Sequence, residues 1–199
     1  MTTLDVIIYV GIFVFACTGA LKARVVHMDF FGGMVMALIM AFGGGSVRDI
    51  LMGNRVRWLN DNISFLLVLA ASLSVFVFKR RTIKYRKTIF FMDAIGLGLY
   101  TVVGIEAAMA NQINPVYSVL LGVVTATFGG LVADVISNAV PSLLKKGELY
   151  ATASTIGGMI YVSTPHLGID RTTNMLLCIA VVVIVRIISK WKKLMLPEI

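Results

Sequence analysis

The stretch Gly43–Asp49 reads GGGSVRD, and it combines three glycines with two opposite charges inside an apolar run long enough to cross a bilayer. Glycine weakens a helix by about 1 kcal/mol relative to alanine, and a charge near the membrane centre costs at least ~2.5–3.5 kcal/mol. Unwound backbone at that depth is tolerated where protein buries it or where it lines a watery cavity. The stretch therefore indicates either the lining of a polar pathway or a tight helix crossing with a structural Arg48–Asp49 pair.

A related pattern lies 85 residues further along the chain, where Gly129–Gly130 and Asp134 repeat the spacing of Gly44–Gly45 and Asp49. Further matches at this offset are Gly11 with Gly96, Gly19 with Gly104 and Ala23 with Ala108. Each unit holds an odd number of apolar spans, so the two units lie in the membrane in opposite senses. Inverted repeats of this kind place sites at broken helices near the midplane, which makes Gly43–Gly45 and Gly129–Gly130 candidate breaks.

The two repeated carboxylates, Asp49 and Asp134, point toward opposite faces of the membrane in such a fold. Carboxylates at both ends of a narrow path favour cations. The alternative is local pairing, of Asp49 with Arg48 or Arg55. Arg48 itself is either a gate that moves off an acid or a permanent structural partner.

Five other polar side chains are candidates for the same pathway. Lys22 and Glu106 lie at repeat-related depths, one position out of register. Ser46, Thr125 and Thr127 flank the two glycine patterns, where hydroxyl groups can replace part of the hydration shell of an ion. Their alternative role is hydrogen bonding to carbonyl groups of their own helix.

The composition is that of an integral membrane protein of one domain. The chain has 199 residues, of which 58% are hydrophobic and only 14% charged, against about 25% in soluble domains. The net charge of +8 comes from basic residues at span ends, which favours membrane lipid over nucleic acid as the partner. Catalytic, cofactor and metal-ligand patterns are lacking, so the sequence predicts no enzyme, no cofactor and no metal beyond transient monovalent cations.

Apolar runs predict seven membrane spans in an all-α fold. The predicted spans are Val6–Lys22, Asp29–Leu51, Ile63–Phe78, Ile89–Ala110, Val116–Val140, Glu148–Ser163 and Thr173–Ile188. The repeats then cover about 5–80 and 89–164, with an extra helix at about 172–190. Of the 18 Lys and Arg residues, all but Arg48, Arg55, Arg57 and Arg171 follow odd-numbered spans. The positive-inside rule therefore predicts an outside N-terminus and a cytoplasmic C-terminus.

Several motifs together resemble the prokaryotic branch of the trimeric intracellular cation channel family, whose bacterial members have also been labelled putative glycine transporters. The resemblance runs from about residue 5 to Trp191. The motifs that carry it are FACTGA at 15–20, DFFG at 29–32, GGGSVRD at 43–49, DAIGL at 93–97, GVVTATFGG at 122–130 with Asp134, and ELYAT at 148–152. The chain departs from the family pattern at Phe128 and Ala133, where a third glycine and an arginine are usual.

The resemblance implies two inverted three-helix repeats plus a seventh helix, assembled as a homotrimer in the inner membrane. It further implies one pore per protomer, lined by the second and fifth spans, kinked at their glycines and passing K⁺ and also Na⁺.

The residues by themselves leave two other functions open. One is a secondary transporter of a small zwitterion such as glycine, since inverted repeats serve transporters too. The other is a non-conducting scaffold, which the short loops disfavour.

Overall fold

The protein is described here by a computed structural model that covers residues 2–78, 85–146 and 149–194. Within these ranges it is all-helical, with seven α-helices and two short 3-10 helices. The elements are α1 (Thr3–Val25), α2 (Phe30–Leu51), η1 (Arg57–Asn60), α3 (Asn62–Val77), α4 (Tyr85–Ala110), α5 (Pro115–Ile136), α6 (Ala151–Ser163), η2 (Thr164–Leu167) and α7 (Arg171–Lys192). The predicted all-α fold with seven helices is confirmed.

Helix ends recur at the same 85-residue offset as the glycine patterns. The Asp29 side chain caps α2 by accepting from the Gly32 N–H, and the Asn114 side chain caps α5 by accepting from the Val116 N–H. Residues with left-handed backbone follow the preceding helices in matching pairs: His27 (φ 59°) with Gln112 (φ 60°), and Gly53 (φ 69°) with Asn138 (φ 51°). The repeat is thus visible in local backbone geometry as well as in residue types.

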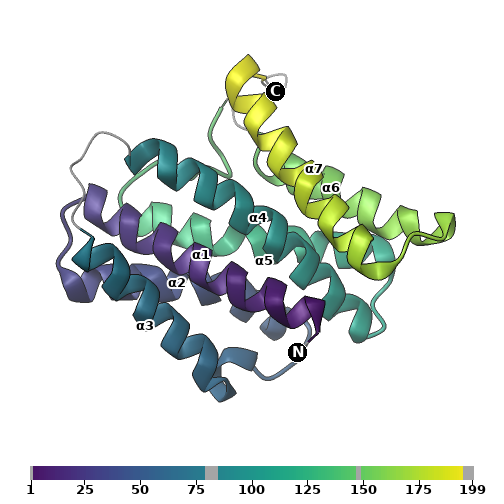
Figure 1. Ribbon diagram of the computed structural model, residues 1–199, viewed down its shortest axis with the longest axis horizontal. Coiled ribbons are helices and arrows are strands. Elements are labelled where there is room, and N and C mark those ends of the chain that lie inside the picture. The colour runs from purple at the N-terminus through teal and green to yellow at the C-terminus, as the bar shows by residue number, and fades with distance from the viewer. Residues whose placement is uncertain (1, 79–84, 147–148, 195–199) are drawn as a thin grey trace.

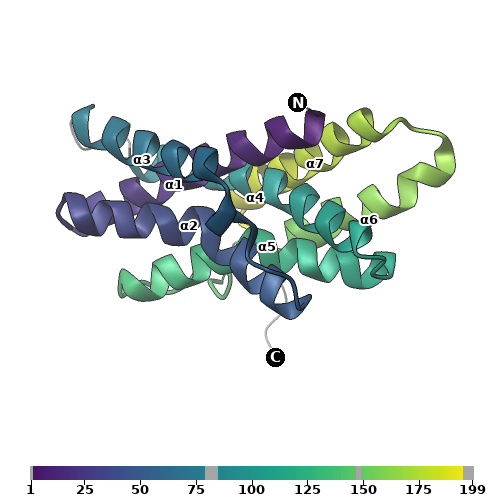
Figure 2. The ribbon, with the colours of Figure 1, turned by 90° about the horizontal axis from the view of Figure 1, so that it is seen from below.

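Helices α1, α2, α4 and α5 form the centre of the molecule. Figure 1 shows α1 and α4 side by side, with α3 on the outer side of α1 and with α6 and α7 at the other side of α4. Helix α2 packs against both α1 and α5, and α4 packs against both α1 and α5. Figure 2 shows the same layers from below, with α2 and α5 on the face away from α3 and α7.

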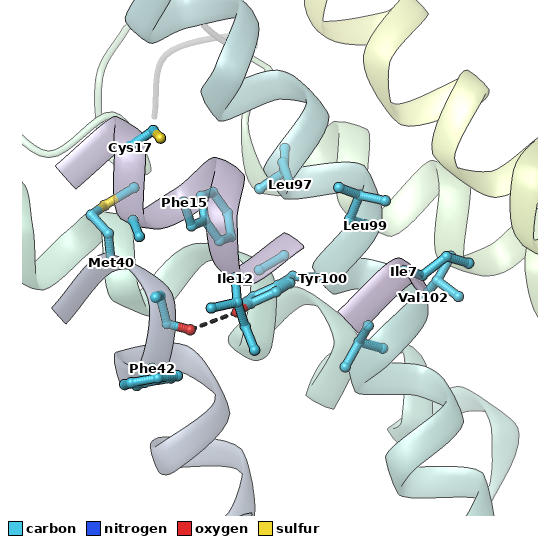
Figure 3. Packing of buried hydrophobic residues seen from close by; sticks show 14 of the residues in the cluster. Ile7, Ile12, Phe15, Cys17, Met40, Phe42, Leu97, Leu99, Tyr100 and Val102 are labelled. Atoms are coloured by element: carbon cyan, nitrogen blue, oxygen red, sulfur yellow. Dashed lines mark hydrogen bonds between the residues drawn. The ribbon is translucent and has the colours of Figure 1, made fainter. Parts of the chain in front are cut away.

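The core between α1, α2 and α4 combines aromatic rings with glycines. The rings of Phe15 and Tyr100 meet edge to face with centroids 4.7 Å apart, and the Tyr100 hydroxyl donates to the Ala41 carbonyl oxygen at 2.6 Å (Figure 3). Gly96 leaves room for the Phe15 ring and Gly11 for the Tyr100 ring, because a Cβ at either position would meet ring atoms within 3 Å. This packing fixes α2 against the rest of the bundle.

Several predicted boundaries are corrected. The fifth span was expected to reach Val140, but α5 ends at Ile136, because Asn138 takes the left-handed conformation that terminates helices. The sixth helix begins at Ala151; the predicted start, Glu148, lies outside the described residues. Among the described residues, five helices are long and apolar enough to cross a membrane, whereas α3 has 16 residues and α6 has 13. The protein is therefore a membrane protein with two short helices among its spans.

The predicted unwinding at the glycine patterns is wrong. The backbone is α-helical through Gly43–Gly45 and through Gly129–Gly130. Figure 2 shows that α2 nevertheless changes direction part-way along its length. Glycines weaken a helix that stands alone, but close contact between α2 and α5 stabilises the helical backbone here. Helix α2 therefore bends without breaking.

The glycines of α4 pack inside one protomer. A Cβ on Gly96 would meet α1, a Cβ on Gly98 would lie 3.1 Å from the Ile179 carbonyl oxygen of α7, and a Cβ on Gly104 would meet α5. Small residues of this kind also allow close packing between the helices of different subunits. Because helices of the same chain fill the space beside all three glycines, these residues give no support for contacts within a trimer.

Candidate functional site

The glycine patterns meet where α2 crosses α5. A Cβ on Gly44 would overlap the Thr125 carbonyl oxygen, and a Cβ on Gly129 would lie 2.6 Å from the Met40 carbonyl oxygen. A Cβ on Gly43 would lie 3.3 Å from the Gly129 Cα. Three of the five candidate glycines therefore let two backbones approach each other, which is the tight crossing that the sequence left open as one interpretation.

The other two glycines, Gly45 and Gly130, face side chains. At Gly45, the nearest atom to an added Cβ is a terminal guanidinium nitrogen of Arg48, 3.7 Å away. At Gly130, it is the Tyr150 hydroxyl oxygen, 3.0 Å away. Gly45 therefore leaves space beside a polar group, whereas Gly130 is in tight contact with one, on the other side of the crossing.

A cavity of ≈ 210 Å³ lies on the Gly45 side of the crossing. It is lined by α1, α2, η1, the start of α3, α4 and α5, and Thr125 and Tyr100 belong to its wall. The charged groups of its lining are Asp5, Arg48, Asp49, Arg57 and Asp61. Because acids outnumber bases there, the cavity has a negative formal charge and attracts cations.

Arg48 and Asp49 form a buried ion pair in this cavity. The Arg48 Nε lies 2.9 Å and a terminal guanidinium nitrogen 2.7 Å from Asp49 Oδ1, and the two side chains are 6% and 2% exposed. The second carboxylate oxygen, Oδ2, accepts the Arg57 backbone N–H at 3.1 Å. Of the partners considered from the sequence, Asp49 therefore takes Arg48 and not Arg55.

Asp134 has a basic partner that the sequence did not reveal. The Lys22 Nζ lies 2.6 Å from Asp134 Oδ1, across the distance between α1 and α5. Asp134 Oδ2 accepts the Ser142 backbone N–H at 2.8 Å. Lys22 is thus the basic partner of Asp134, as Arg48 is the basic partner of Asp49. The position equivalent to Arg48 in the second repeat is occupied by Ala133.

The three candidate hydroxyl groups all bond within their own helices. Ser46 Oγ donates to the Phe42 carbonyl oxygen, Thr125 Oγ1 to that of Leu121 and Thr127 Oγ1 to that of Val123, at 2.6–2.9 Å. Thr125 belongs to the cavity wall, and Ser46 also accepts the indole N–H of Trp58 at 2.9 Å.

Glu106 lies apart from the two aspartates, near the C-terminal end of α4. It accepts a hydrogen bond from the Tyr161 hydroxyl and pairs with Arg171, whose side chain is 67% exposed. These three residues border a separate pocket of ≈ 380 Å³ with α6 and α7. Glu106 is therefore not brought to the α2–α5 crossing.

A buried polar cluster on the Gly130 side was missed from the sequence. The Tyr150 hydroxyl donates to Asp93 Oδ1 at 3.0 Å, and an Arg186 guanidinium nitrogen lies 3.5 Å from Asp93 Oδ2. Lys22 and Asp134 also interact electrostatically with Asp93. The signal was present in Arg186, a charge within the apolar run VVVIVRII that was counted only toward topology.

The charged groups thus gather at two levels, one on each side of the crossing. Arg48 and Asp49 lie near the start of α1 and the end of α2, whereas Lys22, Asp134 and Asp93 lie near the end of α1, the end of α5 and the start of α4. Within the described ranges, no three His, Cys, Asp or Glu side chains are grouped so that they could hold a metal ion. The arrangement is two groups of paired charges, one on each side of the α2–α5 crossing.

The chain is similar to known membrane proteins over most of its length. A family model described as glycine transporter matches residues 5–80 and 90–166. The chain is 30% identical over 191 residues to the inner membrane protein YadS of Escherichia coli K12, covering 94% of this chain and 92% of that protein. It is 33% identical over 168 residues to a membrane protein of Vibrio cholerae, covering 83% and 70%.

Solved structures match over nearly the whole chain. The trimeric intracellular cation (TRIC) channel orthologue from Rhodobacter sphaeroides superposes with a TM-score of 0.90 and 29% identity, covering 96% of this chain and 100% of that one. A prokaryotic TRIC channel studied in KCl superposes with a TM-score of 0.87 and 30% identity, covering 95% and 96%.

Proposed function

Because this chain belongs to the prokaryotic TRIC family, whose family model carries the description glycine transporter, we propose that it is a cation channel that passes K⁺ and Na⁺ through a pore in each protomer of a homotrimer. The proposed pore runs along α2 and α5 and bends with these helices at Gly43–Gly45 and Gly129–Gly130. The protein is then a transport protein and not an enzyme.

The observation that carries the proposal is the negatively charged cavity beside the α2–α5 crossing. The cavity reaches Gly45 and Thr125, so it touches both helices of the proposed pore. An excess of carboxylates at a narrow entrance raises the local concentration of cations and repels anions. In the proposed pathway, Gly45, Ser46 and Thr125 border the path on this side.

The paired charges support a gating role. Arg48 and Lys22 each neutralise an aspartate, so Asp49 and Asp134 attract a passing cation only when their partners move away. Thr127, at the level between the two pairs, belongs to the same proposed path. Glu106, which pairs with Arg171 away from the crossing, is proposed to act outside it.

The proposed orientation in the inner membrane follows the distribution of basic residues. The N-terminus and the cavity with Asp49 then face outward, and the end with Lys22 and Asp134 faces the cytoplasm. The proposed repeats cover 5–80 and 89–164, with the extra helix at 172–190.

Substitution of Gly45 tests the pore directly. Gly44 and Gly129 are poor test positions, because larger residues there would push against backbone. Gly45 lines the cavity, and an added Cβ there has only the flexible end of Arg48 within 4 Å, so a leucine side chain at this position is expected to extend into the cavity. We expect Gly45→Leu to reduce the unitary K⁺ conductance in planar bilayers at least severalfold. Gly33→Leu on the same helix, where no atom lies within 4 Å of the added Cβ, is the matched control.

An unchanged unitary conductance in a correctly assembled Gly45→Leu protein would place the pore elsewhere. A loss in both variants would point to a general effect of leucine on α2 and would also contradict the assignment. Only the loss confined to Gly45→Leu supports it.

A second function, transport of a small zwitterion such as glycine, is favoured by one feature of the cavity. Arg48 can bind a carboxylate group, and the acids Asp5 and Asp61 can bind an ammonium group on the opposite side. A volume of ≈ 210 Å³ is ample for glycine. Saturable uptake of labelled glycine into proteoliposomes, abolished by Arg48→Ala, would favour this function over the channel.

A further inference from the structure

A pocket of ≈ 380 Å³ lies away from the α2–α5 crossing, between the end of α4, the end of α6 and the start of α7. Figure 1 shows the turn between α6 and α7 at one end of the molecule, on the other side of α4 from α3. We call this the α6–α7 pocket, and its polar lining consists of Glu106, Tyr161, Arg171 and Asn174. Because the pocket lies outside the proposed path, its chemistry is independent of conduction.

One acid and one base meet in this pocket, and they differ in exposure. Glu106 pairs with Arg171, and the two side chains are 11% and 67% exposed. The Glu106 carboxylate also accepts a hydrogen bond from the Tyr161 hydroxyl. The carboxylate is thus held in the wall, whereas the guanidinium reaches the surface. An ion pair with one exposed partner contributes little to stability, so support of the fold does not explain this pair.

Both charged groups retain hydrogen-bonding capacity. A carboxylate offers about four acceptor sites, and a guanidinium offers several donors. Glu106 Oε1 accepts from Tyr161 and lies 3.5 Å from Arg171 Nε, and Oε2 accepts from one terminal guanidinium nitrogen. Among the contacts of the described residues, this leaves an acceptor site on Glu106 Oε2 and the second terminal nitrogen of Arg171 for a ligand.

The wall behind these charges is tied together by a buried amide. Asn174 is 3% exposed, and its side-chain N–H donates to the Tyr161 carbonyl oxygen at 2.8 Å. Its side-chain oxygen accepts a hydrogen bond from the Thr164 hydroxyl. These bonds join the end of α6 to the start of α7, so Tyr161 and Arg171 are positioned before a ligand arrives.

A pocket of ≈ 220 Å³ lies at the related place in the first repeat, where Arg24 occupies the position equivalent to Met109. The charges of that pocket bond to backbone groups: Arg24 donates to the Val75 carbonyl oxygen, and Asp29 accepts a backbone N–H of α2. The acid and the base of the α6–α7 pocket bond to side chains instead. A ligand can therefore engage them without loosening the backbone.

The rest of the α6–α7 pocket is apolar. Its remaining lining consists of Met109, Ala110, Pro165 and Ile169. The pocket lies at the ends of α4 and α7, two helices long and apolar enough to cross a membrane. A ligand that fills it thus carries a hydrocarbon portion as well as charged groups, as the headgroup and glycerol region of a phospholipid do.

We propose that the α6–α7 pocket binds a zwitterion in which a protonated primary amine meets Glu106 and a phosphate or carboxylate group meets Arg171. The charges then alternate from the anionic group through Arg171 and Glu106 to the ammonium group, so each faces an opposite charge. Two sources present this chemistry. The headgroup of an amine-bearing phospholipid continues into hydrocarbon, whereas a soluble zwitterion offers the two charged groups alone.

Lipid-dependent stability tests the site in the assembled protein. Delipidated protein in detergent is titrated with phosphatidylethanolamine or with phosphatidylcholine of the same acyl chains, and the thermal unfolding midpoint is followed. Both headgroups carry a positive charge, but only ethanolamine has N–H donors. We expect the parent to bind phosphatidylethanolamine roughly tenfold more tightly, because a hydrogen bond between charged groups is lost with choline. Glu106→Gln should abolish this preference, although its amide oxygen can still accept from Tyr161.

Two arginine variants complete the test. Arg171→Gln should weaken the binding of both lipids together, since both carry the phosphate group. Arg55→Gln is the matched control, because Arg55 is exposed and is absent from the pocket lining. It should leave both affinities unchanged. The ratio of the two affinities is measured within each variant, so a general loss of stability cancels.

Soluble phosphoethanolamine distinguishes the two sources. If it stabilises the parent and not Glu106→Gln, the pocket takes a free zwitterion. If the parent responds to the lipid alone, with its preference for ethanolamine, the pocket takes a headgroup whose hydrocarbon fills the apolar lining. Equal binding of the two lipids by the parent, together with no response to phosphoethanolamine, would overturn the proposal. A Glu106→Gln protein that keeps every response of the parent would overturn it as well.

Discussion

At the scale of single residues, the small size of a few glycines decides how closely the helices approach. Gly44 is the tightest case, because the Thr125 carbonyl oxygen occupies the space of its missing Cβ. Gly45, one residue later, has only the tip of Arg48 nearby. Two adjacent glycines therefore have different surroundings, one against the backbone of α5 and one beside the cavity.

We expect Gly44→Ala to destabilise the protein by about 1–3 kcal/mol or more, because one backbone must move away from another. For a chain of this size this corresponds to a fall in melting temperature of several degrees, roughly 2–4 °C per kcal/mol. Gly45→Ala should melt close to the parent. Thermal unfolding in detergent measures both, and equal melting temperatures for the two variants would refute the tight crossing.

The Lys22–Asp134 pair gives a second prediction at this scale. Its side chains are only 12% and 9% exposed, so removal of one charge leaves the other buried without its partner. Asp134→Asn alone should destabilise by roughly 3–5 kcal/mol. Adding Lys22→Met should recover most of this loss, since the amide oxygen of asparagine can still accept the Ser142 N–H. A double variant that is less stable than Asp134→Asn would show that the pair is not coupled.

At the scale of elements, matching caps start α2 and α5. Asp29 accepts the Gly32 N–H at 2.7 Å, and Asn114 accepts the Val116 N–H at 3.0 Å. Each side chain satisfies a backbone donor that the first turn of its helix leaves without an intrahelical partner. The two helices of the crossing are thus started by equivalent caps.

Removing either cap should destabilise the protein by about 1 kcal/mol. Asp29→Ala and Asn114→Ala should lower the melting temperature by similar amounts, whereas Asp29→Asn, which keeps a capping oxygen, should be close to neutral. A neutral result for both alanine variants would show that the caps contribute nothing to these helices.

The sequence predicted the elements better than the contacts between them. The lengths of the apolar runs were sufficient to predict seven helices, and the 85-residue offset between Asp49 and Asp134 was sufficient to predict the repeat. Both features can be read directly from the order of residues along the chain. The pair of Lys22 with Asp134 depends on how α1 and α5 pack, which no local pattern encodes. Helical backbone at Gly43–Gly45 was missed for the same reason, because a neighbouring helix stabilises what propensity alone disfavours.

At the scale of the whole molecule, charge is arranged at two levels along one crossing. The level with Arg48 and Asp49 borders a cavity, and the level with Lys22 and Asp134 is joined by Asp93 and Arg186. The two levels are related by the repeat yet use different basic residues.

The orientation of the molecule is testable by fusion. A reporter joined after Ile199 should be active on the cytoplasmic side, because the basic residues follow the odd-numbered spans. The matched fusion is one joined before the first helix, which should report the outer side. Reversed signals would exchange the faces assigned to Asp49 and Asp134.

Recording from the purified parent protein in planar bilayers under a KCl gradient tests the proposed channel most directly. We predict discrete unitary steps whose reversal potential lies close to the equilibrium potential of K⁺, because the cavity beside the α2–α5 crossing is negatively charged. An absence of unitary steps in protein that takes up glycine saturably in proteoliposomes would contradict the channel and favour a transporter.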